Sequence, residues 1–162
     1  MNERRINNEA VLLQMLNESL LREGMGVRVR VTGSSMRPFI RDNDIAVVES
    51  ISEESLKKGD IIVYRMSQQY VVHRLLKIII SEYETLYVCK GDSCCRKDMP
   101  VAAEHIYGRV SLIERGSRRF NMNHRKWTRR NKMLARISSY TPVFYRIARI
   151  IRKFVRRQPK QY

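Results

Sequence analysis

Long hydrophobic runs are missing from this chain of 162 residues, and cysteine is scarce. No apolar run approaches the ~20 residues that a helix needs to span a bilayer. Polar residues interrupt the short apolar stretch after Arg4 and Arg5, so no secretory signal peptide is expected. The three cysteines include the adjacent pair Cys94 and Cys95, which predicts neither a disulfide framework nor a metal site. These absences predict a cytoplasmic location, and no cofactor is expected.

Acidic residues are also missing from the last part of the chain. Residues 115–162 hold sixteen of the 32 Lys and Arg side chains and none of the sixteen Asp and Glu. The formal net charge of +16 therefore resides there, and residues 1–114 are neutral. A neutral body with a basic tail predicts a polyanionic partner, which is nucleic acid, anionic lipid or an acidic protein face.

The end of the basic tail has the pattern of an amphipathic helix. After Pro142, apolar residues recur at helical spacing with Arg and Lys between them. This pattern is typical of helices on an anionic membrane surface, and equally of helices that pack their apolar face on a body. A peripheral contact with the cytoplasmic membrane face is therefore one expectation. Phe120 and Trp127 lie among Lys and Arg residues, as in proteins that bind single-stranded nucleic acid. Because the chain has no known nucleic-acid-binding motif, nucleic acid is the weaker prediction.

The body between these features has the pattern of a β protein. Its apolar runs predict six strands, at residues 27–31, 45–48, 61–64, 70–80, 86–89 and 106–113. Turns rich in Gly and Asp join them, which predicts a compact, mostly β fold. An amphipathic helix is expected before Gly24 and Gly26. The predicted organisation is an N-terminal helix at 1–26, a β domain at 27–114, and a basic helical tail at 115–162.

Three residues in the β domain have side chains suited to acyl transfer. Ser35 lies in a turn constrained by Gly33 and Pro38, His73 lies on the predicted strand 70–80, and Asp98 lies in the loop after the predicted strand 86–89. A serine hydroxyl needs a neighbouring base, which a histidine supplies near neutral pH. A carboxylate behind the imidazole fixes its tautomer. Taken singly, each residue has an ordinary interpretation as a polar turn, a strand histidine or a turn aspartate.

Five segments, in order, resemble the signal peptidase I and LexA-like serine peptidases. The first is similar to their Gly-x-Ser-Met-x-Pro box, and the third to the Val-His-Arg-Val strand of the histidine-base subgroup, namely endoplasmic-reticulum, archaeal and some Gram-positive signal peptidases. The five segments are 32–38, 58–64, 72–75, 90–98 and 106–110. The resemblance implies a β-rich, partly barrel-like fold and a serine endopeptidase that cleaves leader or signal peptides.

The same resemblance implies a role for each site residue. Ser35 would be the nucleophile, His73 the general base and Asp98 the third member, with Asp92 a weaker candidate for that place. The chain departs from the pattern at Gly33, where some members have a hydroxyl donor to the oxyanion, and at Ser93 and Cys94, where the family has two asparagines.

Two alternatives stand beside the peptidase hypothesis. Neither a membrane anchor nor a DNA-binding domain is expected before residue 27, so the chain resembles small relatives of both groups. A non-catalytic binding module, with the basic tail on nucleic acid or an anionic membrane, is the main alternative. A catalytically silent relative is the other.

Overall fold

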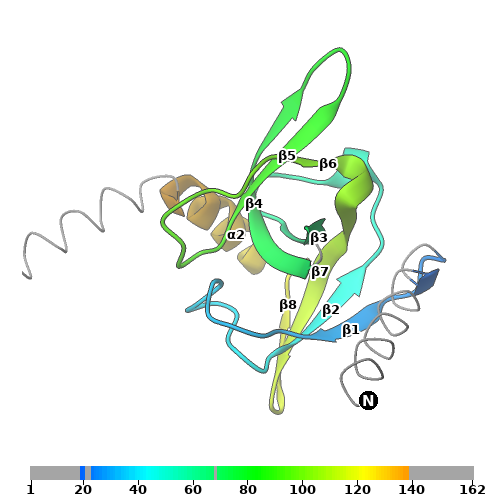
Figure 1. Ribbon diagram of the computed structural model, residues 1–162. Coiled ribbons are helices and arrows are strands. Elements are labelled where there is room, and N and C mark those ends of the chain that lie inside the picture. The colour runs from blue at the N-terminus through cyan, green and yellow to red at the C-terminus, as the bar shows by residue number, and fades with distance from the viewer. Residues whose placement is uncertain (1–18, 21–22, 68, 139–162) are drawn as a thin grey trace, which may run out of the picture.

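The computed structural model of the protein describes residues 19–20, 23–67 and 69–138 (Figure 1). These residues form one eight-stranded antiparallel sheet and one longer helix, which confirms the predicted mostly β fold. The strands are β1 Val27–Arg30, β2 Ile45–Glu49, β3 Ile61–Met66, β4 Gln69–Ile80, β5 Thr85–Lys90, β6 Val101–Ala102, β7 Ile106–Arg115 and β8 Arg118–Asn121. The helices are the short η1 Glu53–Ser55 and η2 Ala103–His105, and α2 Arg125–Ile137.

The strands follow the order β1-β2-β7-β3-β4-β5-β6, with β8 also paired to β7. Irregularities in register occur at Val47/Val48, Val63/Tyr64 and between Leu75 and Lys77. Such irregularities bend a strand and increase its twist. Figure 1 shows the outcome, a sheet that curls around its own interior.

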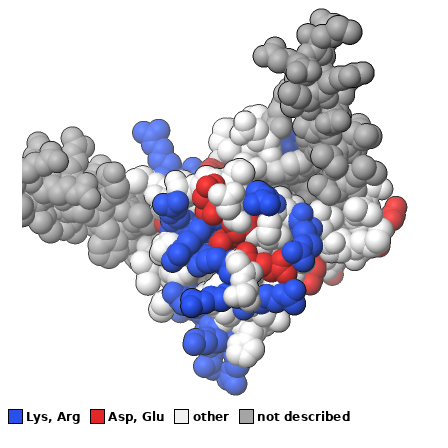
Figure 2. Space-filling model, turned by 90° about the horizontal axis from the view of Figure 1, so that it is seen from below, with Lys and Arg blue, Asp and Glu red and all other residues white. Residues whose placement is uncertain are grey.

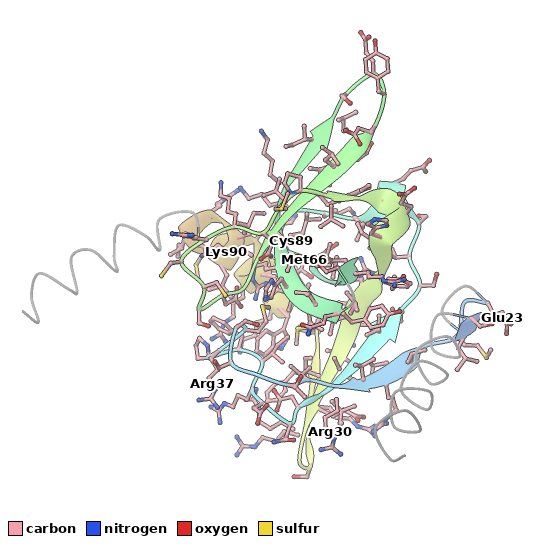
Figure 3. The ribbon with its side chains drawn as sticks, viewed as in Figure 1. Glu23, Arg30, Arg37, Met66, Cys89 and Lys90 are labelled. Carbon is pink, nitrogen blue, oxygen red and sulfur yellow. The ribbon has the colours of Figure 1, made fainter. Side chains whose placement is uncertain are left out.

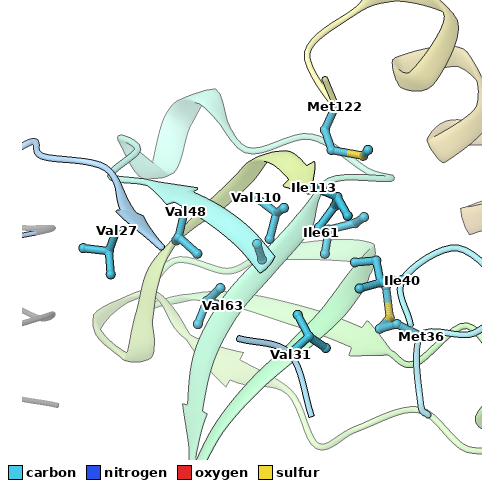
Figure 4. Packing of buried hydrophobic residues seen from close by; sticks show 11 residues of the cluster. Val27, Val31, Met36, Ile40, Val48, Ile61, Val63, Val110, Ile113 and Met122 are labelled. Carbon is cyan, nitrogen blue, oxygen red and sulfur yellow. The ribbon is translucent and has the colours of Figure 1, made fainter. Parts of the chain in front are cut away.

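Strand β3 is buried on both faces and divides the interior into two clusters. Successive side chains of a strand point to opposite faces, so Ile61 and Val63 enter one cluster while Ile62 and Tyr64 enter the other. The first cluster also contains Met36 and Ile40 from the turn that carries Ser35, as Figure 4 shows. The second cluster includes Leu56, Leu75, Tyr87, Cys89 and Val101.

Helix α2 is attached to the body at both of its ends. At its N-terminus, His124 accepts a hydrogen bond from the Lys126 amide, and the Trp127 ring meets Phe120 of β8 edge-on at 5.7 Å between centroids. At its C-terminus, the buried Lys90 ammonium donates to the Ser138 carbonyl and hydroxyl at 2.8 and 2.7 Å. A cation at the last carbonyls of a helix also interacts favourably with the helix dipole.

The structure differs from the predicted organisation after residue 114. The predicted boundary at 114/115 falls within β7, and the chain then turns at Gly116, whose φ is +55°, to add β8 to the sheet. The predicted N-terminal helix lies mostly outside the described residues, with residues 19–20 helical, and the final helix after Pro142 lies entirely outside them. In the described part, no helix combines the length and hydropathy needed to span a bilayer.

Candidate active site

Two of the three predicted site residues form a direct pair. His73 Nδ1 lies 2.7 Å from Asp98 Oδ2, and their side chains are only 10% and 13% exposed. His73 is in the middle of β4, and Asp98 is in the loop between β5 and β6, fastened to β5 by its amide on the Cys89 carbonyl at 2.9 Å. A carboxylate acceptor at Nδ1 places the ring proton there, so the lone pair of the neutral imidazole is at Nε2.

Asp98 is held in its ionised form by donors. Burial acts to raise the pKa of Asp98, but hydrogen bonds from His73 and Tyr64, with the charge of Lys90, outweigh it and leave the pKa below its ordinary value. The Tyr64 hydroxyl donates to Asp98 Oδ2 at 2.7 Å. Burial, then Asp98, raises the pKa of Tyr64 far above its usual value, so this hydroxyl keeps its proton. The carboxylate therefore faces the imidazole with its charge intact.

The turn that carries Ser35 is fixed from three directions. Below it, Met36 and Ile40 are buried in the first cluster. On one side, the Gly33 amide donates to the Asp42 carboxylate at 2.8 Å. On the other, both the amide and the hydroxyl of Ser93 donate to the Ser35 carbonyl, at 2.8 and 2.9 Å. These contacts hold the half-buried Ser35 against the loop that carries Asp98.

Gly91 marks the point where the serine turn and the histidine meet. A Cβ placed on Gly91 would lie 2.8 Å from the Ser35 carbonyl oxygen and 3.0 Å from His73 Nε2. These two atoms therefore border one small space and are no farther apart than the sum of those distances. The Cys94 sulfur borders the same space, 2.7 Å from that Cβ position. The main chain of Ser35, in the turn after β1, thus lies beside the His73–Asp98 pair carried by β4 and the loop after β5.

Asp92, the weaker candidate for the third member, is committed elsewhere. Both of its carboxylate oxygens accept from Arg74, at 2.7 Å each, and the two side chains are 0% and 5% exposed. Arg74 also donates to the Gly59 carbonyl at 3.0 Å. Because Arg74 follows His73 on β4, its side chain points to the opposite face of the sheet. Asp92 is therefore a structural partner of Arg74, and the aspartate that contacts His73 is Asp98.

Sequence reasoning missed three residues that shape this site. Tyr64 ends an apolar run, and a buried tyrosine needs a partner for its hydroxyl, which was the available signal. Ser93 stands where the resembling family has asparagine and supplies the contact to the serine turn. Cys94 stands at the second position where the resembling family has asparagine, which was the available signal, and Figure 3 shows its loop starting from Cys89 and Lys90 on the side of the molecule where Arg37 lies.

No cluster of three or more His, Cys, Asp and Glu side chains in the described ranges is arranged to hold a metal ion. Lys90 is buried beside this loop, and burial lowers the pKa of its ammonium group while Asp92 acts to raise it. Its contacts with Ser138 assign it a structural position at the end of α2. The chemistry that the described groups offer is proton transfer at Nε2 of His73.

The curled antiparallel sheet places the turn that carries Ser35 next to the His73–Asp98 pair. A sequence model of the family described as Peptidase S24-like matches residues 4–87, more than half of the chain. The chain therefore belongs to the Peptidase S24-like family, and the match includes Ser35 and His73 but ends before Asp98. No curated protein and no solved structure matches the chain.

Proposed function

We propose that this protein is a serine endopeptidase with Ser35 as nucleophile, His73 as general base and Asp98 as the third member. The observation that carries the proposal is the His73–Asp98 pair at 2.7 Å, whose nitrogen Nε2 borders the same space as the main-chain carbonyl of Ser35. This is the order of groups that activates a weak nucleophile, because each holds the next one in the correct protonation state.

With these roles for Ser35, His73 and Asp98, the proposed reaction has two stages. The Ser35 hydroxyl adds to the scissile carbonyl carbon and gives its proton to His73 Nε2. Asp98 stabilises the imidazolium through the Nδ1 proton. His73 then protonates the leaving amine as the C–N bond breaks and an acyl-enzyme forms. Water then adds to the carbonyl carbon of the acyl-enzyme and gives a proton to His73. The bond to Ser35 breaks, His73 returns the proton to the Ser35 oxygen, and the peptide leaves with a free carboxyl group.

A serine-reactive phosphonate probe tests this assignment directly. The expected result is covalent labelling of the wild-type chain and loss of labelling in Ser35→Ala and His73→Ala. Ser34→Ala is the matched control, because Ser34 is the adjacent, exposed serine of the same turn and is expected to leave labelling intact. Equal labelling of wild type, Ser35→Ala and His73→Ala would contradict the proposal.

The proposed substrates are leader or signal peptides. This part rests on the five segments that resemble signal peptidases. Incubation with synthetic leader peptides and mass spectrometry of the products tests it. One cleavage site, lost in Ser35→Ala, would support the assignment, whereas labelling by the probe without cleavage of any leader would leave a serine hydrolase with another substrate.

A second candidate function is binding to an anionic surface, and the charges of the described residues favour it. Figure 2 shows Lys and Arg gathered on one face, with acidic side chains among them. Two acidic side chains of the described residues are already paired with cations, since Glu114 meets Arg28 and Arg119, and Asp44 meets Arg115. On α2, exposed cations have no ion pair with another described residue, and they include Arg125, Lys126, Arg129 and Lys132. Unpaired cations of this density attract polyanions.

Flotation with liposomes distinguishes this candidate from the peptidase. Binding to anionic but not neutral vesicles, weakened when Arg125, Arg129 and Lys132 are changed together to Gln, would support an anionic-membrane contact. A deletion of residues 140–162 tests the predicted contribution of the final helix. Salt-dependent binding to oligonucleotides, with no labelling of Ser35, would favour a nucleic-acid-binding module instead.

A further inference from the structure

The hydroxyl of Tyr64 occupies a position behind the catalytic pair that the proposed mechanism does not use. Tyr64 is fully buried on β3, and its oxygen lies 2.7 Å from Asp98 Oδ2 and 3.3 Å from His73 Nδ1. The same carboxylate oxygen receives the imidazole proton at 2.7 Å. Two side chains, Tyr64 of β3 and His73 of β4, thus converge on Oδ2 of Asp98 in the loop after β5.

We propose that Tyr64 is a positioning residue that aims one oxygen of Asp98 at the imidazole of His73 and limits how strongly that oxygen holds the imidazole proton. This inference rests on the proposed function, because it gives the pair a task in acyl transfer. Tyr64 reaches no reacting atom in this arrangement and acts through Asp98.

The geometry supplies the physical reason for both effects. A carboxylate on the loop can rotate about its last bond and present either oxygen, but a second donor at Oδ2 fixes which one faces His73. That donor also shares the negative charge of the oxygen, which weakens its attraction for a protonated imidazole. Burial keeps the Tyr64 hydroxyl protonated at any working pH, so it donates throughout the catalytic cycle.

Other titratable groups surround Tyr64, His73 and Asp98, and the test variants leave these neighbouring side chains unchanged. Cys89 and Lys90 approach from β5, and Cys94 approaches from the loop beside His73 Nε2. Burial, reinforced by Asp98, raises the pKa of both Cys89 and Cys94, so neither thiol carries charge near neutral pH. The groups that can carry charge here are therefore Lys90, Asp98 and the imidazole of His73.

The decisive variant is Tyr64→Phe, which keeps the ring and removes the hydroxyl. Without this donor, Asp98 loses one of the hydrogen bonds that lower its pKa, so its carboxyl carbon is expected to titrate at higher pH in the variant, as followed by NMR. Asp44 serves as an internal reference, because its pKa is lowered by hydrogen bonds from Arg115 and the Arg41 amide and not by Tyr64.

Activity gives a second, independent readout. The acid limb of the pH–rate profile is expected to move upward with the Asp98 carboxyl group, and the rate on its plateau to fall about tenfold, the size of one charge-assisted hydrogen bond. A merely structural tyrosine would lower the rate equally at every pH. Tyr107→Phe is the matched control, since it removes a hydroxyl from a tyrosine that stacks on Tyr70 and packs on the other cluster.

A double variant separates this inference from the proposed function. In an Asp98→Asn background, Tyr64→Phe is expected to change the rate no further, because the effect acts through the carboxylate. An unchanged Asp98 titration in Tyr64→Phe that is folded, as judged by thermal unfolding, would overturn the positioning role. Failure of Ser35 labelling would overturn the peptidase proposal while leaving the NMR result to stand alone.

Discussion

His73 and Arg74 are neighbours on β4, and each is bonded to an aspartate of the loop between β5 and β6, but the two pairs differ in chemistry. Arg74 makes a bidentate, almost fully buried pair with Asp92. His73 makes a single bond to Asp98 and leaves its other nitrogen facing the space beside Ser35. Because β4 alternates, one strand sends a fixed cation to one face and an exchangeable proton carrier to the other.

The difference teaches how a sequence separates scaffold from chemistry. A guanidinium is always charged and its planar fork suits two carboxylate oxygens, so the Arg74–Asp92 pair can hold the loop in place but cannot transfer a proton. An imidazole can gain and lose a proton near neutral pH. We therefore expect loss of the Asp98 charge to lower the rate of hydrolysis, and loss of the Asp92 charge to lower the free energy of unfolding.

Asp98→Asn is expected to have the largest effect, on hydrolysis. The amide can no longer stabilise the imidazolium and favours the wrong tautomer, so the rate should fall about 10⁴-fold, while stability changes little. Steady-state kinetics with a cleaved peptide, together with urea unfolding, checks both parts. A large loss of stability with a modest loss of rate would reverse the comparison.

Asp92→Asn is expected to have its main effect on stability. Removing the charge leaves the Arg74 guanidinium buried without its carboxylate, which should cost about 3–5 kcal/mol of unfolding free energy. Urea unfolding measures this loss. Arg74→Met with Asp92→Leu is the control, because removing both charges should restore much of the stability; if that double variant is no more stable than Asp92→Asn, the pair is not an isolated structural clamp.

Gly91→Ala is expected to disturb both pairs, since Gly91 precedes Asp92 and borders His73. The added methyl would lie under 3.0 Å from the Ser35 carbonyl and the Cys94 sulfur. Such overpacking should cost about 1–3 kcal/mol and abolish probe labelling. Adding Cys94→Ala relieves only the sulfur contact, so full recovery of labelling in that double variant would show that the serine turn is not part of the crowding.

The smallest expected effect is the pH dependence of stability. The folded-state pKa of Asp98 lies below its ordinary value, so its contribution is present above about pH 4 and is lost as the pH falls through the folded pKa. The pKa of Asp44 is lowered too, since hydrogen bonds from Arg115 and the Arg41 amide outweigh burial. Unfolding midpoints at pH 7 and pH 3 should differ less in Asp98→Asn than in wild type, and an equal difference would contradict the assignment.

Much of the fold could be predicted because six strands are long enough to show their period. The core of β3 appears as a continuous apolar run at 61–64, as expected of a strand buried on both faces, and β4 appears as a longer, mainly apolar stretch at 70–80. Two strands could not be found this way. β6 has two residues, and β8 contains Arg118 and Arg119, whose side chains are exposed and give no apolar signal. They exist because β5 and β7 offer unpaired edges next to them.

The site was less predictable because its contacts are made across the sheet. The residue types and the family resemblance pointed to Ser35, His73 and Asp98, but nothing in the order of residues separates Asp92 from Asp98 as the partner of the histidine. The separation depends on the register in which β5 leads into its loop beside β4. Tyr64 could not be assigned either, because its hydroxyl reaches a residue 34 positions away.

Because Lys90 contacts Ser138, a truncated chain must extend at least to Ser138 to keep the surroundings of Lys90. Any fragment that stops before Ser138 loses two oxygens that receive the Lys90 ammonium, one residue away from Gly91. Helix α2 therefore supports the loop after β5, and truncations that test the basic tail should remove only residues after Ser138.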